Sequence, residues 1–390
     1  MKVLQVIPSL SWVHGGPSRA IRLIEHALIN QGISVETIAT DDDGPGERLQ
    51  RAYGMALTEE GSIRRYYRKW LDFYIVAPGM LVWLLRNVDR YDVVHVHAQF
   101  SFASLAGAWA ARRAGVPYII RPLGTLSHYS LQSRRPWVKK LSLLLFEKRL
   151  LRDAAAVHFT SELEQTEALA LGVSLRSRVI PLAVDGVPTP SRVTVEQHFP
   201  ELINFDVVLY LSRIDPKKNI EGLLRAFALC TPARPQLRLL VVGDGSSTYL
   251  SSLKSRAREL GIEQKVAWAG HLSGEAKDAA FGLASVFALP SFSENFGIAA
   301  VEALAAGVPS VLSEGVAIAG DARDAGAALV STTDPSSIAE AIATLLDDAE
   351  ARHRMSDRAR AFAERTYSVS AMGRSLIDLY NHVVEEKTRR

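Results

Sequence analysis

Short apolar runs alternate with amphipathic stretches along the whole chain. In the first half the runs cover 3–7, 35–39, 93–96, 118–120, 155–159 and 179–180, and in the second half 207–211, 237–242, 266–268, 286–289, 309–312 and 328–330. Helical patterns fit between most of them, as over 17–30, 104–114, 220–229 and 338–346. Continuous apolar strands separated by helices are typical of parallel sheets covered on both faces. The pattern therefore predicts an α/β protein with two doubly wound, Rossmann-like parallel sheets.

The boundary between the two domains is predicted near 183–191. This stretch is rich in proline and polar residues and precedes the apolar run that begins at 207. We assign 1–186 to an N-terminal domain and 187–366 to a C-terminal domain, because 390 residues are too many for one core. The remaining tail, 367–390, begins with an amphipathic helical pattern. Ligands of doubly wound sheets bind beyond the carboxyl ends of the strands, so we expect the active site in a cleft between the domains.

The most informative segment follows the apolar run 286–289 and leads into an alanine-rich helix. From 293 to 304 it reads SENFGIAAVEAL. Strand, turn and helix place Phe296 and Gly297 at a helix N-terminus, where free N–H groups and the helix dipole favour phosphate. Glu294 lies in the turn and Glu302 inside the helix, so the two carboxylates are too far apart to touch. We expect them to hold different parts of one extended ligand, such as hydroxyl groups on either side of a diphosphate.

This segment resembles the Glu-x7-Glu motif of the retaining family-4 glycosyltransferases, which have the GT-B fold. The pattern Ser-x-Glu-x-Phe-Gly and the later sequence AAGVP (305–309) make the resemblance more specific. It covers essentially the whole chain and is strongest from 207 to 312. The resemblance implies that an N-terminal acceptor-side domain, with the tail packed back on it, faces a C-terminal domain that binds a nucleotide sugar. It also implies transfer of a hexose from a UDP-, GDP- or dTDP-sugar to an acceptor hydroxyl, with retained configuration and without a cofactor.

The resemblance gives individual residues their roles. Glu294 would hold hydroxyl groups of the donor hexose, and Glu302 the ribose. Arg213 and Lys218 share the loop after 207–211, where two cations can neutralise a diphosphate leaving group. The residues expected to act in catalysis are Glu294, Arg213, Lys218 and His97. The residues expected to bind the donor are Gly15, Gly16, Gly243, Asn295, Phe296, Gly297, Ile298 and Glu302.

The glycines and histidines rest on local arguments as well. Gly15 and Gly16 join the first strand to its helix and allow close approach of the backbone to a ligand. Gly243 ends the strand 237–242, where a small residue lets a nucleotide approach, although the third glycine of a dinucleotide fingerprint is absent. His97 ends the strand 92–97 and reaches its carboxyl end, whereas His95 is expected to be a packing residue.

One position departs from the family pattern. Many members carry a His or Arg near the donor sugar, just after the strand that corresponds to 118–120. Leu123 occupies the matching position here, and Arg121 lies close enough to take its place as a sugar or acceptor contact. Two alternatives therefore stay open: a sugar-nucleotide epimerase of GT-B architecture, and a catalytically silent nucleotide-sugar-binding protein.

The charge of the chain is unevenly distributed. Residues 1–186 contain 23 Lys/Arg and 17 Asp/Glu, and 93–152 contain ten basic residues and one acid. Two runs, 64–70 and 132–140, mix basic and aromatic residues, and a helix over 64–70 would place four cations on one face. Such segments fit an anionic membrane surface, or serve only as solubilising faces. No nucleic-acid-binding motif accompanies the charge. We expect a cytoplasmic protein at the inner face of the plasma membrane and a lipid-linked sugar acceptor in bacterial surface or exopolysaccharide assembly.

Neither a metal site nor a membrane span is predicted. The triplet Asp41-Asp42-Asp43 is expected to be a solvated loop, and no His/Cys cluster has metal-ligand spacing. The apolar stretch 73–85 is short and is broken by Pro78-Gly79. The N-terminus reads as a first strand rather than a signal sequence, and the single Cys230 suits a reducing cytosol.

Overall fold

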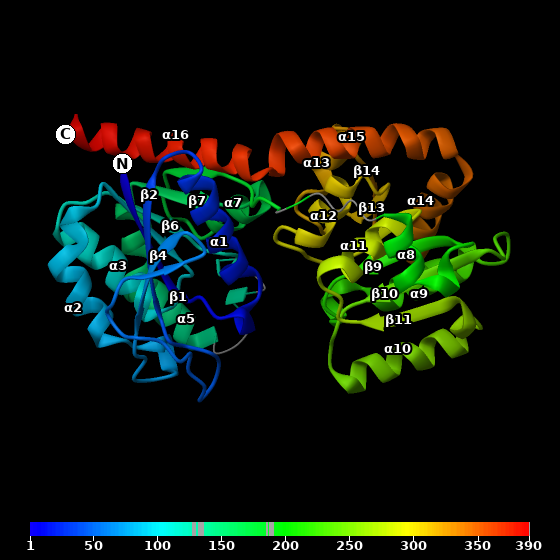
Figure 1. The fold of residues 1–390 in the computed structure, drawn as a ribbon, viewed down its shortest axis with the longest axis horizontal. Helices are drawn as coiled ribbons and strands as arrows, with labels where there is room; N and C mark the ends of the chain where they lie inside the picture. The colour runs from blue at the N-terminus through cyan, green and yellow to red at the C-terminus, as the bar shows by residue number, and fades with distance from the viewer. Residues whose placement is uncertain (127–129, 132–135, 185, 187–190, 390) are drawn as a thin grey trace. The chain divides into compact units, whose positions relative to one another are not determined.

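The computed structural model describes residues 1–126, 130–131, 136–184, 186 and 191–389. The chain divides into two compact units (Figure 1). Unit 1 consists of Met1–Ala183 and Val369–Arg390, and unit 2 consists of Val184–Ser368. Each unit is built on one sheet that is wholly or mainly parallel, as the alternation of strands and helices predicts.

Unit 1 contains an eight-stranded sheet in the order β3-β4-β2-β1-β5-β6-β7-β8. All neighbouring strands are parallel except β3 and β4. Its strands are β1 (Lys2–Ser9), β2 (Ser34–Thr40), β3 (Leu57–Glu59), β4 (Ser62–Tyr67), β5 (Val93–His97), β6 (Tyr118–Arg121), β7 (Ala156–Phe159) and β8 (Ser177–Val179). Its helices are α1 (Gly16–Ile29), α2 (Pro78–Asn87), α3 (Phe102–Arg113), α5 (Pro136–Ser142), α6 (Lys148–Asp153), α7 (Glu162–Leu169) and α16 (Val369–Thr388). Short turns are η1 (Trp12–His14), η2 (Phe73–Ile75), η3 (Val88–Arg90) and the π-helical turn η4 (Leu143–Glu147).

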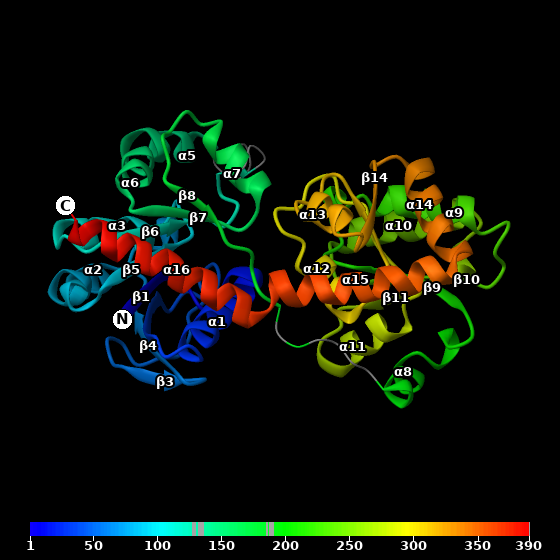
Figure 2. The ribbon, with the colours of Figure 1, turned by 90° about the horizontal axis from the view of Figure 1, so that it is seen from above.

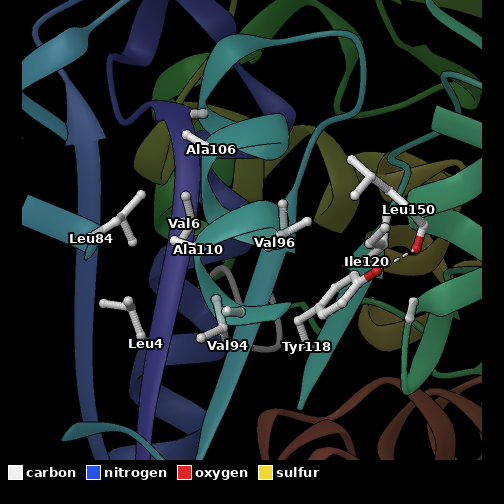
Figure 3. Close-up of a cluster of buried hydrophobic side chains, with 14 of the residues drawn as sticks. Leu4, Val6, Leu84, Val94, Val96, Ala106, Ala110, Tyr118, Ile120 and Leu150 are labelled. Atoms are coloured by element: carbon white, nitrogen blue, oxygen red, sulfur yellow. Dashed lines mark hydrogen bonds between the residues drawn. The ribbon is translucent and has the colours of Figure 1, made fainter. Parts of the chain in front are cut away.

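Alternating residues of the central strands supply two cores, one on each face of this sheet. Val6 and Val96 point to the face covered by α2 and α3, where Ala106 and Ala110 pack on them (Figure 3). Val3 and Val93 point to the opposite face, covered by α1 and the C-terminal helix α16 (Figure 2). The last helix of the chain is therefore part of the core of unit 1.

Unit 2 contains a six-stranded parallel sheet in the order β11-β10-β9-β12-β13-β14. The strands are β9 (Asp206–Leu211), β10 (Leu237–Val242), β11 (Val266–Gly270), β12 (Val286–Leu289), β13 (Ser310–Ser313) and β14 (Ala328–Ser331). The helices are α8 (Arg192–His198), α9 (Ile220–Cys230), α10 (Ser247–Glu259), α11 (Gly274–Leu283), α12 (Ile298–Ala306), α13 (Ala319–Asp324), α14 (Pro335–Asp347) and α15 (Ala349–Tyr367). Short turns are η5 (Pro200–Leu202), η6 (Pro216–Lys218) and η7 (Glu263–Lys265).

Both sheets have a topological switch point, where chain order runs outward in opposite directions from two neighbouring strands. In unit 1 the switch lies between β1 and β5, and in unit 2 between β9 and β12. In open α/β sheets, the loops that follow such a strand pair diverge, and ligands bind there, outside the carboxyl ends of the strands.

The predicted basic helical face over 64–70 is wrong. The residues to Tyr67 form strand β4, which pairs with β2. Arg64 is buried and bonds to Glu25 (Nη2–Oε2, 2.6 Å) and Glu60 (2.9 Å). Lys69 is buried as well, and its ammonium group contacts Asp42 at 2.6 Å. A buried, paired cation cannot bind a membrane surface.

In the described part of the chain, we find no helix with both the length and the apolar composition needed to cross a bilayer.

Candidate active site

Three loops meet at the switch point of unit 2. They follow β9, β10 and β12, and backbone hydrogen bonds hold them side by side. The N–H of Ile214 donates to the carbonyl of Asp244 (2.7 Å), and the N–H of Phe292 donates to the carbonyl of Lys217 (2.9 Å). The loop after β12 is fixed on its other side, because the N–H of Glu294 donates to the carbonyl of Gly315 (2.8 Å). Hydrogen bonds therefore join the loops at the carboxyl edge of this sheet to one another.

Lys218 and Glu294 form an ion pair at this switch point. Lys218 ends the turn η6, whose N-cap Asp215 accepts a hydrogen bond from the N–H of Lys217 (2.9 Å). The side chain of Lys218 is buried, and that burial, together with nearby Arg213 and Lys217, lowers its pKa to about 8. Arg213 itself is exposed. Two residues expected to hold different parts of a donor thus lie in direct contact.

Gly297 begins helix α12 with a left-handed backbone (φ 83°). A Cβ atom there would lie 3.2 Å from Cγ1 of Val316 and 3.3 Å from Cγ of Glu294, so the close turn requires glycine. Phe296 is buried and packs edge-on against Tyr367, with ring centroids 5.7 Å apart. The Phe296 side chain therefore fixes the turn from the protein side, and Asn295 and Ile298 beside it are half-buried.

Glu302 lies inside helix α12, and its side chain is buried. Its Oε1 contacts Nζ of Lys277, on α11, at 2.9 Å. Lys277 belongs to no recognisable motif and lies 25 residues before Glu302 in the chain. The sequence therefore does not indicate that the two residues pair. Each carboxylate of the Glu-x7-Glu segment is thus paired with a lysine from another element.

The glycines after β10 have a local structural reason. Gly243 has φ 142°, and a Cβ atom there would overlap the backbone oxygen of Ser212. At Gly245 a Cβ atom would overlap the backbone oxygen of Ile214 in the same way. The loops after β9 and β10 therefore need glycine to lie side by side, whether or not a nucleotide approaches.

Gly15 and Gly16 lie at the switch point of unit 1, between η1 and α1. Gly15 has a left-handed φ of 64°, and its N–H donates to the carbonyl of Trp12 (2.9 Å).

The expectation of a solvated loop at Asp41–Asp43 is wrong. Asp41 and Asp42 are buried; the carboxylate of Asp41 accepts from the N–H of Lys69 (2.7 Å), and that of Asp42 contacts Nε2 of His14 (2.7 Å). Among the described residues no group of three or more His, Cys, Asp or Glu side chains could hold a metal ion.

His97 and Arg121 end the neighbouring strands β5 and β6 and are register partners. Both side chains are fully buried. Burial and the nearby Arg121 charge lower the pKa of His97 well below its ordinary value, and burial lowers the pKa of Arg121 to about 10. The structure thus brings these two predicted residues together, but beneath the surface. Leu123 follows with a left-handed φ of 59°.

The chain matches two family models that together span most of its length. Residues 15–183 match the model "Glycosyl transferase 4-like domain", and residues 195–362 match "Glycosyl transferases group 1". A D-inositol 3-phosphate glycosyltransferase of Kineococcus radiotolerans is 27% identical over 89% of this chain and 78% of its own length. One of Corynebacterium glutamicum is 34% identical over 46% of this chain, and the match spans 44% of that relative. A crystal structure of Anabaena HepE in complex with UDP shares the fold, with a TM-score of 0.77 at 19% identity over 98% of this chain and all of that one.

Proposed function

Because this chain belongs to the family-4 glycosyltransferases of the GT-B fold, we propose that it moves a hexose from a nucleotide diphosphate sugar to an acceptor hydroxyl, retaining the anomeric configuration and using neither metal nor cofactor. The observation that carries the proposal is the Lys218–Glu294 pair at the switch point of unit 2. Cation, carboxylate and the start of α12 converge there, and they match the three chemical parts of such a donor.

Donor binding would exchange partners within this pair. A diphosphate offers more negative charge to Lys218 than one carboxylate does, and the exposed Arg213 adds a second cation. Glu294, released from Lys218, could then accept hydrogen bonds from hexose hydroxyls. The N–H groups of Ala300 and Val301 donate to the carbonyl of Gly297, so the N–H groups before them, at the start of α12, would bind the diphosphate or sugar, and Glu302 would hold the ribose. Positive charge placed at the leaving group stabilises the charge that grows there in the transition state.

A thermal-shift panel tests donor binding. A donor that binds only the folded chain stabilises it by roughly 2.7 kcal/mol at 100-fold saturation, so at least one of the UDP-, GDP- and dTDP-sugars should raise the melting temperature. The variant Lys218→Met should lose that rise. A chain that responds to no nucleotide sugar would contradict the proposal.

The acceptor side of the proposal includes a membrane surface. Helix α5 and turn η4 expose apolar side chains, each more than half exposed: Trp137, Leu141, Leu144, Leu145 and Phe146. We call these five the apolar ridge. Lys140 and Arg149 flank it and are exposed. An apolar face bordered by cations fits the interface of an anionic bilayer, where each cation contributes about 1 kcal/mol. Of the second basic-aromatic run, residues 136–140 lie on α5, and residues 132–135 lie outside the described part.

Docking through the apolar ridge would place the enzyme at the cytoplasmic face of the plasma membrane, next to a lipid-linked sugar acceptor. Co-sedimentation with anionic and neutral vesicles tests this. Pelleting should require anionic lipid and should fall in Leu144→Ser/Phe146→Ser, whereas Leu229→Ser, which removes an exposed apolar side chain of unit 2, should pellet like wild type. Equal pelleting with both vesicle types would count against docking. Turnover with free inositol phosphate, together with no turnover with a lipid-linked sugar, would contradict the proposed lipid-linked acceptor.

A further inference from the structure

A line of buried polar side chains crosses unit 1 behind the strand ends. It begins at the backbone carbonyl of Ile180, which lies 2.9 Å from Nε2 of His158 on β7. Nδ1 of His158 lies 3.3 Å from Nε2 of His95 on β5. Nδ1 of His95 lies 2.8 Å from the hydroxyl of Tyr380, which the C-terminal helix α16 contributes. Three elements far apart in the chain are therefore joined by successive hydrogen bonds.

The line continues from Tyr380 to the end of β5. The amide nitrogen of Gln5, on β1, donates to the hydroxyl oxygen of Tyr380 (3.3 Å). The amide oxygen of Gln5 lies 2.5 Å from Nε2 of His97. All five side chains of the line are fully or almost fully buried. We call this line the histidine relay.

The carbonyl of Ile180 sets the direction of every bond in the relay. A carbonyl only accepts, so Nε2 of His158 must carry a proton. A neutral ring then has an unprotonated Nδ1, which accepts from Nε2–H of His95. Nδ1 of His95 accepts in turn from the Tyr380 hydroxyl, whose oxygen is left to accept from Gln5. The oxygen of Gln5 accepts from Nε2–H of His97, and the last ring is left with an unprotonated Nδ1.

The reversed relay fails at its first bond. It would leave Nε2 of His158 unprotonated, with its lone pair facing the lone pairs of the Ile180 carbonyl. A doubly protonated ring would remove that conflict, but burial lowers the pKa of His158 to about 3 and the pKa of His95 well below its ordinary value. Neutral rings with Nε2–H are thus the arrangement that satisfies every hydrogen bond of the relay.

We propose that Tyr380 is a positioning residue: its hydroxyl passes the direction set at the Ile180 carbonyl on to Gln5, so that His97, the register partner of Arg121, keeps an unprotonated Nδ1. Among the described residues neither Nδ1 of His97 nor the three guanidinium nitrogens of Arg121 has a hydrogen-bond partner. The two residues are register partners at the strand ends. The opposite tautomer would place an N–H at Nδ1 of His97 and remove this acceptor from the ends of β5 and β6.

This role deepens the proposed function. The kcat measurement below rests on that function, whereas the measurement of the ring tautomers does not. Arg121 is the last residue of β6, and the next residues form the loop that contains the left-handed Leu123. Arg121 is also the residue that the sequence predicts as a sugar or acceptor contact. The relay would therefore let the C-terminal helix orient a group at the strand ends without touching any ligand itself.

Long-range ¹H–¹⁵N correlation spectra of the full chain, labelled with ¹⁵N-histidine, read each ring tautomer directly. Single His→Gln variants assign the three signals. The relay predicts that His95, His97 and His158 are all neutral with Nε2–H at pH 7. An Nδ1–H tautomer or a charged ring at any of the three would overturn it, whatever reaction the protein catalyses.

The variant Tyr380→Phe tests the positioning role. It should change the Nδ1 signal of His97 or mix its tautomers, and lower kcat about tenfold with little change in the KM of the donor. The matched control is Tyr118→Phe, which removes another buried hydroxyl of unit 1, bonded to the carbonyl of Leu150 (2.8 Å) and outside the relay. If Tyr380→Phe folds poorly, Gln5→Met breaks only the last links. If the His97 signal and kcat of Tyr380→Phe are like those of the control, the proposal is refuted. If the wild type binds no donor, the proposed function is refuted instead.

Discussion

Glu147 should make the stability of unit 1 fall as the pH rises. It ends the π-helical turn η4, and it is buried. One carboxylate oxygen accepts from the N–H of Phe100 (3.2 Å), and the other accepts from the amide nitrogen of Gln99 (3.2 Å). Burial outweighs these bonds and raises the pKa of Glu147 from 4.5 to about 7. The perturbation that isolates this effect is Glu147→Gln, which keeps the shape and removes the charge.

The size and the sign of the effect follow from linkage. Below pH 4.5 the carboxyl group is protonated in both the folded and the unfolded chain, so its ionisation does not change the free energy of unfolding. Between 4.5 and about 7 the unfolded chain ionises while the folded chain keeps its proton, so the free energy of unfolding falls by about 1.4 kcal/mol per pH unit. The total loss is about 3 kcal/mol and is complete above pH 7.

The glutamine variant should escape this loss. Its side-chain oxygen can still accept from Phe100, and its NH₂ group needs an acceptor. The amide oxygen of Gln99 is buried and has no partner among the described residues, so a turn of that amide supplies one. The variant should therefore match the wild type near pH 5 and exceed its free energy of unfolding by about 2–3 kcal/mol at pH 8.

Urea unfolding followed by tryptophan fluorescence can report unit 1 alone. Five of the six tryptophans lie in unit 1, and Trp268→Phe removes the one in unit 2. The chain with Glu147 and the Glu147→Gln variant should both carry Trp268→Phe and be unfolded at half-unit steps from pH 5 to 8. Parallel profiles for the two proteins would show that this carboxyl group titrates alike in the folded and unfolded chain, and the reasoning would be refuted.

Three further outcomes are expected. Lys218→Met and Glu294→Gln should each lower turnover about 10²–10³-fold, while Lys254→Ala, at an exposed position of α10, should not; turnover near wild type in both site variants would remove the pair from the mechanism. Activity should survive excess EDTA in initial-rate assays, and loss of activity that Mg²⁺ or Mn²⁺ restores would overturn the metal-free proposal. Gly243→Ala should lower the free energy of unfolding of unit 2 by about 3 kcal/mol, because its backbone conformation and the Ser212 carbonyl leave no room for a methyl group; calorimetry that shows no destabilisation would contradict this.

The sequence predicts the fold well because the central strands are buried on both faces. Runs such as 93–96 and 286–289 are continuous and apolar, and they become β5 and β12. Strand β4 is missed because its sequence, SIRRYY, carries charges that read as a surface helix. Its Arg64 is neutralised by Glu25, which precedes it by 39 residues, and local patterning cannot show a partner that distant.

The sequence predicts candidate residues for the site but not their contacts with one another. Strand-end positions identify Lys218 and Glu294, because ligand-binding residues of doubly wound sheets follow strands. Their contact, however, depends on β9 and β12 being neighbours, which the order of strands along the chain does not give. Lys277 with Glu302 and Tyr380 with His95 are hidden for the same reason: side chains far apart in sequence meet only in the folded unit.

The anomeric proton of the first product shows whether the enzyme transfers sugar from a nucleotide sugar with retained configuration. The enzyme would be incubated with each α-linked nucleotide sugar of the panel, without acceptor and then with candidate acceptors, and followed by ¹H NMR from the first turnovers. We expect that nucleoside diphosphate is released from at least one donor and that the sugar first appears as the α-anomer, with both signals strongly reduced in Lys218→Met. A sugar that first appears as the β-anomer, or a chain that consumes no donor, would contradict it.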